Sequence, residues 1–183
     1  MHYAGLFHVN DINTLPLNSV ITYFSYMKTA SISELKQELI NTPQKELTQL
    51  CLRLAKFKKE NKELLTFLLF EAHDIEVYIN NVKTLMNEAF TEVHKTNLYY
   101  AKKNLRRILR TVSKHIKYTG SRQAEAELLI HFCKLVKQSG IALGKSTALY
   151  NMYVQQFKKI KAAIDTMHED LQYDLMKEVE KLA

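Results

Sequence analysis

The chain has 183 residues, of which 46% are hydrophobic and 25% charged, and its formal net charge is +7. This composition is typical of globular proteins and excludes an intrinsically disordered chain. A chain of this length most simply forms one domain. Its two cysteines, Cys51 and Cys133, are too few for a disulfide framework. Because each lies among helically spaced apolar residues, we expect two buried free thiols, as in a reducing cytoplasm.

No apolar stretch of the sequence approaches the roughly 18–20 residues that cross a membrane. The N-terminus also lacks the basic and apolar segments of a secretion signal. We therefore expect no transmembrane segment and a cytoplasmic location. The densest apolar run, Leu64–Phe70, is expected to be the most buried helix of the core.

From Lys45 to Thr119 the chain contains no Gly or Pro, and apolar residues recur there every three or four positions. Strands need turn residues more often than this, so the pattern predicts an all-α protein. Short connections favour antiparallel helical hairpins, about seven helices in all, packed as a bundle or as a short α-solenoid-like array.

Residues 1–26 differ from the rest because they contain no Lys or Arg and a single acid, Asp11. We expect either a loosely ordered extension over 1–26 or a natural start of translation at Met27. The alternative is an ordered arm that docks apolar side chains such as Phe7 and Phe24 onto the core. Residues 27–183 are expected to form a single all-helical domain.

Helix starts and ends are marked by capping residues. Ser31 and Glu34 have the spacing of a capping box, and Thr42 with Pro43 is expected to begin a second helix. For residues 58–62 both a turn and a continuous helix remain open. The residues expected to face inward from these two helices are Leu35, Leu39, Ile40, Leu47, Leu50, Cys51, Leu54 and Phe57.

Three further helices follow the same rules. Asp74 is expected to cap a helix that buries Tyr78 to Val93, and Asn97 to begin one that reaches Tyr118. Gly120 and Ser121 end that helix and begin the next, which reaches Gly140.

A long C-terminal helix is expected from about Ser146 almost to the end of the chain. The preceding Gly140–Ser146 segment imitates a phosphate-binding loop but is one residue too short and follows a helix rather than a strand. It is better explained as a turn between helices. The predicted apolar spine of the long helix is Leu149, Tyr153, Phe157, Ile160, Ile164, Met167, Leu171, Leu175, Val179 and Leu182.

Between residues 95 and 122 the chain has many cations and no acid, and this segment accounts for the whole excess of positive charge. Its cations are Lys95, Lys102, Lys103, Arg106, Arg107, Arg110, Lys114, Lys117 and Arg122. At 100° per residue, apolar residues gather on one side of the predicted helix and cations on the other. We call the outer set the basic stripe: Lys103, Arg106, Arg107, Arg110, Lys114 and Lys117, with Tyr99 among them.

The basic stripe has three interpretations. It is a solvated or internally paired face, covered by the acidic last helix; it binds an anionic macromolecule; or it binds another acidic partner. Among anionic macromolecules nucleic acid precedes a membrane surface, because the opposite face is needed for the core. Arg suits phosphates, and Tyr99 or Tyr100 can stack on a base. The acids of the last helix are Asp165, Glu169, Asp170, Asp174, Glu178 and Glu180.

No catalytic constellation and no metal-ligand spacing is found, and no cofactor is expected. We therefore expect a non-catalytic helical interaction module whose partner is an unknown protein or anionic macromolecule. The alternative is a sequence-tolerant nucleic-acid binder that uses the helix at about 97–118. A third hypothesis is an enzyme whose site assembles from residues distant in sequence.

The stretch LCLRLAKFKKENKELL at residues 50–65, followed by Leu69–Ala72, resembles an uncharacterised family of small all-helical bacterial proteins. The resemblance extends from Met27 to about Cys133. It implies a helical fold and a start at Met27, and it assigns no activity and no site residues.

Overall fold

The structure, a computed structural model, describes residues 29–182. Within this range every regular element is helical, which confirms the all-α prediction. The chain divides between Arg53 and Leu54 into two compact units. No helix of residues 29–182 is long and apolar enough to cross a bilayer. The expectations for residues 1–26 lie outside the described range, and a single domain over 27–183 stays a prediction.

The first unit contains α2 (Ile32–Asn41) and most of α3 (Gln44–Phe57). The capping box before α2 is confirmed, since the Ser31 amide donates to Glu34 Oε2 at 2.7 Å and the Glu34 amide donates to Ser31 Oγ at 3.3 Å. Neither helix buries a residue, so their predicted inward positions are wrong. Two helices of 10 and 14 residues have too little surface to enclose a core. The exposed positions are Leu35, Leu39, Ile40, Leu50, Cys51, Leu54 and Phe57.

The second unit begins with the last turn of α3, after which the helix is broken at Lys58. Lys58 is extended between α3 and α4 (Lys59–Thr66), and the Asn61 side-chain amide donates to the Leu54 carbonyl at 2.9 Å across this turn. A π-helical turn, η2 (Phe67–Glu71), then follows α4 directly. Of its apolar side chains only Phe67 is buried, whereas Leu68, Leu69 and Phe70 are 56–67% exposed. The prediction for this run is wrong because a helix packed on one side buries one face only.

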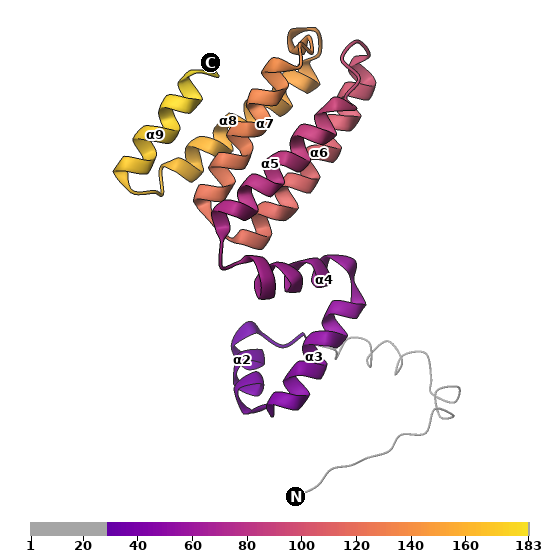
Figure 1. Cartoon of the computed structure of the whole chain (residues 1–183), viewed down its shortest axis with the longest axis vertical. Coiled ribbons are helices and arrows are strands. Elements are labelled where there is room, and N and C mark those ends of the chain that lie inside the picture. The colour runs from indigo at the N-terminus through magenta and orange to yellow at the C-terminus, as the bar shows by residue number, and fades with distance from the viewer. Residues whose placement is uncertain (1–28, 183) are drawn as a thin grey trace, which may run out of the picture. The chain divides into compact units, whose positions relative to one another are not determined.

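Five helices form the bundle-like body of this unit: α5 (Ile75–Thr91), α6 (Leu98–Thr119), α7 (Arg122–Gln138), α8 (Thr147–Ile164) and α9 (Glu169–Glu180) (Figure 1). Helix α7 contacts each of the other four and is therefore the centre of the core. Its buried residues are Ala124, Ala126, Leu128, Leu129, Ile130, Phe132, Cys133 and Val136.

The predicted caps of these helices are confirmed. Asp74 Oδ1 accepts a hydrogen bond from the Val77 amide at 3.0 Å, and Asn97 Oδ1 accepts from the Tyr99 and Tyr100 amides at 3.0 and 3.3 Å. Gly120 ends α6 with φ +59°, in the left-handed region that favours glycine. Ser121 Oγ accepts a hydrogen bond from the Ala124 amide at 3.3 Å. The capping residues thus fix where α5, α6 and α7 begin.

The predicted long C-terminal helix is wrong, because α8 ends at Ile164 and α9 begins at Glu169. The Thr166 hydroxyl donates to the Ala163 carbonyl at 2.8 Å and the Met167 amide to the Ile164 carbonyl at 2.9 Å, which closes the turn. The apolar spacing continues across this turn because both helices pack against α7. Periodicity alone therefore does not reveal the break, and the described chain has eight α-helices.

Candidate anion-binding groove

The basic stripe lies on α6, whose opposite side is held in the core. Ala101, Leu105, Ile108 and Val112 are buried, as the apolar period predicts. Because α6 is a continuous helix from Leu98 to Thr119, the stripe is fixed on the side that faces away from these residues.

A hollow with a volume of about 910 Å³ runs along the outer side of α6. We call it the α6–α8 groove, because α8 forms its second wall. From α8 come Met152, Gln156 and Lys159, and α4 contributes Glu60. The residues from α6 are Tyr99, Lys102, Lys103, Arg106, Leu109, Arg110, Ser113, Lys114, Lys117 and Tyr118.

The structure brings together all members of the stripe except one. Arg107 does not line the α6–α8 groove but lies beside a smaller hollow between α5 and α6. Its guanidinium is 3.4 Å from Glu92 Oε2, and both side chains are well exposed. The stripe covers a wide arc of α6, so that Arg107 at its edge lies toward α5 rather than toward α8.

Most cations of the groove have no anionic partner in the described part of the chain. Lys114 is the exception, with its Nζ 2.6 Å from Glu63 Oε2. Glu60 is the one acid among the lining residues. The six groove cations without a carboxylate within 4.0 Å among residues 29–182 are Lys102, Lys103, Arg106, Arg110, Lys117 and Lys159.

The acidic C-terminal helix does not neutralise these cations. Among the described residues, α9 forms an ion pair with another helix at Glu178, whose Oε2 lies 2.8 Å from Lys134 Nζ of α7. No described ion pair joins the stripe to any acid of residues 165–180. The groove cations therefore face solvent rather than α9.

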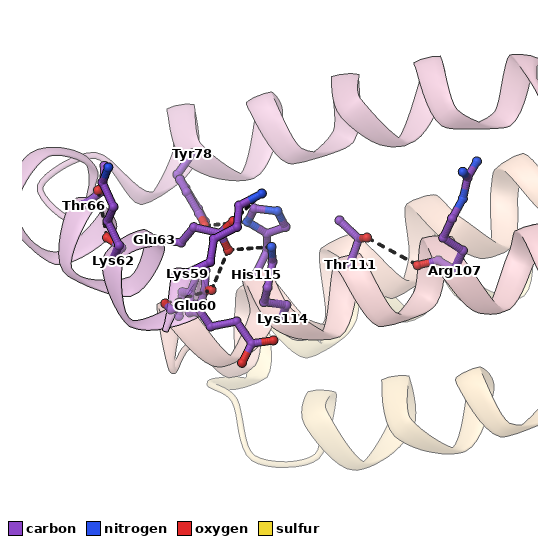
Figure 2. A network of polar contacts seen from close by, with 11 residues as sticks. Lys59, Glu60, Lys62, Glu63, Thr66, Tyr78, Arg107, Thr111, Lys114 and His115 are labelled. Carbon is purple, nitrogen blue, oxygen red and sulfur yellow. Dashed lines mark hydrogen bonds and ion pairs between the residues drawn. The ribbon is translucent and has the colours of Figure 1, made fainter. Parts of the chain in front are cut away.

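A polar network lies where α4 meets α6 and includes Lys114, which also lines the groove (Figure 2). Glu63 accepts hydrogen bonds from Lys114 Nζ and, at 3.0 Å, from the Tyr118 hydroxyl. The bond from Lys114 lowers the pKa of Glu63, against the opposing effect of burial. Glu63 is thus ionised at neutral pH and holds Lys114 toward α4.

Behind this network Tyr78 of α5 and His115 of α6 form a second polar contact (Figure 2). The Tyr78 hydroxyl lies 2.7 Å from His115 Nδ1. Burial raises the pKa of Tyr78 to about 12. Burial also lowers the pKa of His115, and the neighbouring Lys114 lowers it further. Both groups are therefore neutral at pH 7, and the pair joins α5 to α6 without adding charge.

The floor of the groove differs in chemistry from its rim. Leu109 and Met152 are half-buried, and Gln156 is only 5% exposed. The Gln156 Nε2 donates to the Met152 carbonyl at 2.8 Å, whereas its Oε1 has no hydrogen-bond partner among the described residues. The floor thus combines apolar surface with one amide oxygen that remains able to accept a hydrogen bond.

Of the groove residues that the stripe did not include, one comes from α4, four from α6 and three from α8. Met152, Gln156 and Lys159 follow one another at spacings of four and three, so they share one helix face. That signal is present in the sequence. The spacing does not show which other helix lies next to this face of α8, because the position of α8 relative to α6 is set by the packing of both helices on α7.

Comparisons of the chain with protein-family models, with curated proteins and with solved structures give no match. The resemblance carried by residues 50–65 therefore stays a prediction. Among residues 29–182 no three His, Cys, Asp or Glu side chains gather as ligands of a metal ion.

Proposed function

We propose that the chain is a non-catalytic helical module that binds nucleic acid through the phosphate backbone, without sequence preference, in the α6–α8 groove. The observation that carries the proposal is the gathering, around one hollow, of six cations that have no carboxylate partner among residues 29–182. In this proposal the helices pair as antiparallel hairpins, the protein is cytoplasmic, and the partner of the predicted interaction module is a polyanion.

Electrostatics favours a polyanion at this place. Like charges spaced three or four residues apart on a helix repel each other by a few tenths of a kcal/mol per pair. A phosphate chain relieves this repulsion and releases its own condensed counterions, which supplies most of the affinity of sequence-independent binding. Arg106 and Arg110 add planar donor forks that match phosphate oxygens.

A membrane surface suits the groove less well. A helix that lies on a membrane inserts its apolar face among the lipid chains. The apolar face of α6 is buried in the core, including Leu105 and Val112, which are fully buried. The cations are therefore available for electrostatic contact without insertion, which is the requirement of a backbone binder.

The proposal is tested by fluorescence anisotropy with a labelled 20-nucleotide strand at several salt concentrations. If all six cations contact phosphates, the slope of log affinity against log salt is about −4 for a single strand. Changing both Arg106→Glu and Arg110→Glu should lower the affinity more than tenfold at about 100 mM salt and make the slope shallower by about 1.4.

The matched control carries Lys158→Glu and Lys161→Glu. These lysines are exposed on α8 on either side of Lys159 and do not line the groove. The control changes the net charge by the same amount, so it should retain most of the affinity. Equal losses in the two variants, or no binding by the parent at low salt, would contradict the proposal; circular dichroism checks that both variants fold.

A further inference from the structure

We infer that the nucleic acid held in the α6–α8 groove is single-stranded, with its phosphates along the cationic rim and its bases turned against the floor. This inference rests on the proposed function and adds the class of nucleic acid. Two observations support it. The rim of the groove is charged whereas its floor is apolar, and the side chains of Tyr99 and Gln156 offer contacts that suit a base rather than a phosphate.

The rim and the floor suit different parts of a nucleotide. Lys103, Arg106 and Arg110 are exposed and offer charge to phosphates that keep part of their hydration. Leu109 and Met152 below them offer apolar surface, on which a phosphate would lose its water without compensation. A base has apolar faces and polar edges, so it matches such a floor.

Gln156 provides the polar contact that the edge of a base requires. Its side chain is 5% exposed and lines the groove, and its Nε2 is already bonded to the Met152 carbonyl of its own helix. Its Oε1, without a partner among the described residues, is able to accept a hydrogen bond from an amino or imino group of a base. A phosphate oxygen, which only accepts, would not satisfy it.

Tyr99 offers a stacking surface at the other end of the groove. It is 66% exposed, and its contact with Tyr100 is edge-to-face, at 5.4 Å between ring centroids. Stacking of a base on an exposed aromatic ring is a common, sequence-tolerant contact with single strands.

The length of the groove fits a short strand. From Tyr99 to Tyr118 the α-helical rise spans about 29 Å, the length of roughly eight nucleotides at the duplex spacing of 3.4 Å. In a duplex the faces of the bases are covered by stacking and their pairing edges by the opposite strand. The floor would then remain empty, so we expect the groove to prefer a single strand.

The experiment compares five ligands. A mixed-sequence DNA strand, the same strand as RNA, an abasic strand and inorganic polyphosphate have equal phosphate number, and the duplex of the DNA strand is compared per phosphate. Binding is measured by competition against the labelled single strand at one salt concentration. We expect both single strands to bind at least tenfold more tightly than the abasic strand, the duplex and polyphosphate.

Two variants separate stacking from charge. Tyr99→Ala should lower the affinity for the single strand about fivefold or more and leave the affinity for the abasic strand unchanged. Tyr100→Ala is the matched control, because Tyr100 is the adjacent exposed aromatic residue and does not line the groove. It should change neither affinity. Gln156→Leu should reduce the advantage of the single strand over the abasic strand.

The outcomes distinguish this inference from the proposed function. If the abasic strand or the duplex binds as tightly as the single strand, the inference is overturned and backbone binding stands. The same holds if Tyr99→Ala weakens single-strand and abasic binding equally. If none of the five ligands binds at low salt, both are overturned.

Discussion

At the scale of single residues, Glu63 determines how much charge the groove offers. Glu63 Oε2 lies 2.6 Å from Lys114 Nζ, so the charge of Lys114 is already paired. The side chains of Lys114 and Glu63 are 31% and 30% exposed. It also fixes the hydroxyl of Tyr118, whose ring lines the groove. The same carboxylate thus serves the packing of α4 on α6 and, in the proposed function, limits the affinity of the groove for nucleic acid.

Replacing Glu63 by Gln should therefore change stability and binding in opposite directions. Loss of a partly exposed ion pair should lower the free energy of unfolding by about 0.5–1 kcal/mol. Release of Lys114 should tighten the binding of a single strand and make the salt slope more negative by about 0.7. Urea unfolding and anisotropy measure the two effects.

Glu125→Gln is the matched control for this variant. Glu125 forms an ion pair with Arg122 at 2.7 Å, and neither residue lines the groove. It removes the same formal charge and should leave the affinity nearly unchanged. An unchanged affinity in Glu63→Gln would show that Lys114 does not contact the ligand.

His115 makes stability depend on pH. Burial and Lys114 lower the pKa of His115 in the folded state, whereas Glu63 opposes this. The unfolded chain therefore binds more protons between the folded pKa and about 6.5, and stability falls as the pH falls through this window. His131 acts in the same direction, because burial and then Lys83 and Lys134 lower its pKa.

We expect the double variant His115→Gln and His131→Gln to lose less stability between pH 7.5 and pH 5 than the parent. Its free energy of unfolding at pH 7.5 should itself be lower, because the contact of His115 with Tyr78 is weakened. Urea unfolding at five pH values checks both points. This range lies above the titration of Glu63, whose pKa is lowered. An identical pH slope in parent and variant would contradict the assignment.

At the scale of helices, the sequence predicted what local chemistry determines. The caps at Ser31, Asp74, Asn97 and Ser121 lie where they were expected, because a cap needs only residues within one turn. The turn at residues 165–168 was missed because its apolar spacing is set by the packing of α8 and α9 on α7. Exposure of Leu68, Leu69 and Phe70 was missed for a related reason, since hydrophobicity does not tell how many neighbours a helix has.

The groove was predictable only in part, because the packing of one helix beside another is not determined by local sequence. Its α6 side follows from the sequence alone, because residues on one helix keep fixed angular positions. Lys159 and Gln156 join it through the packing of α8 beside α6 on α7, and Arg107 leaves it at the edge of the stripe. A helical wheel gives the angle of a side chain and not the neighbour that it meets.

The boundary between α6 and α7 depends on one backbone conformation. Gly120 has φ +59°, a left-handed backbone conformation that residues with a Cβ rarely adopt. An added Cβ would meet no other atom within 4 Å, so any strain would come from the backbone conformation alone. Gly120→Ala should lower the free energy of unfolding by about 1 kcal/mol, measured by urea unfolding. Gly144→Ala is the control, because an added Cβ there also meets no atom and no positive φ is involved. Equal effects of the two substitutions would contradict the assigned strain.

At the scale of the whole chain, burial is distributed unequally between the two units. All described buried residues lie in residues 54–182, with α7 contributing the largest share. The groove also belongs entirely to this unit. In α2 and α3 no residue is buried, and helices of this length are marginally stable by themselves.

Amide hydrogen exchange followed by mass spectrometry should therefore divide the chain near Arg53. Peptides from residues 29–53 should exchange by local opening, orders of magnitude faster than those of α7, which should exchange only on global unfolding. Addition of the single strand should slow exchange in α6 and α8 and leave residues 29–53 unchanged, because the described groove residues all lie in α4, α6 and α8. Protection of α2 and α3 equal to that of α7 would mean that another surface covers their apolar side chains in solution, and the two-unit description would then have to be replaced.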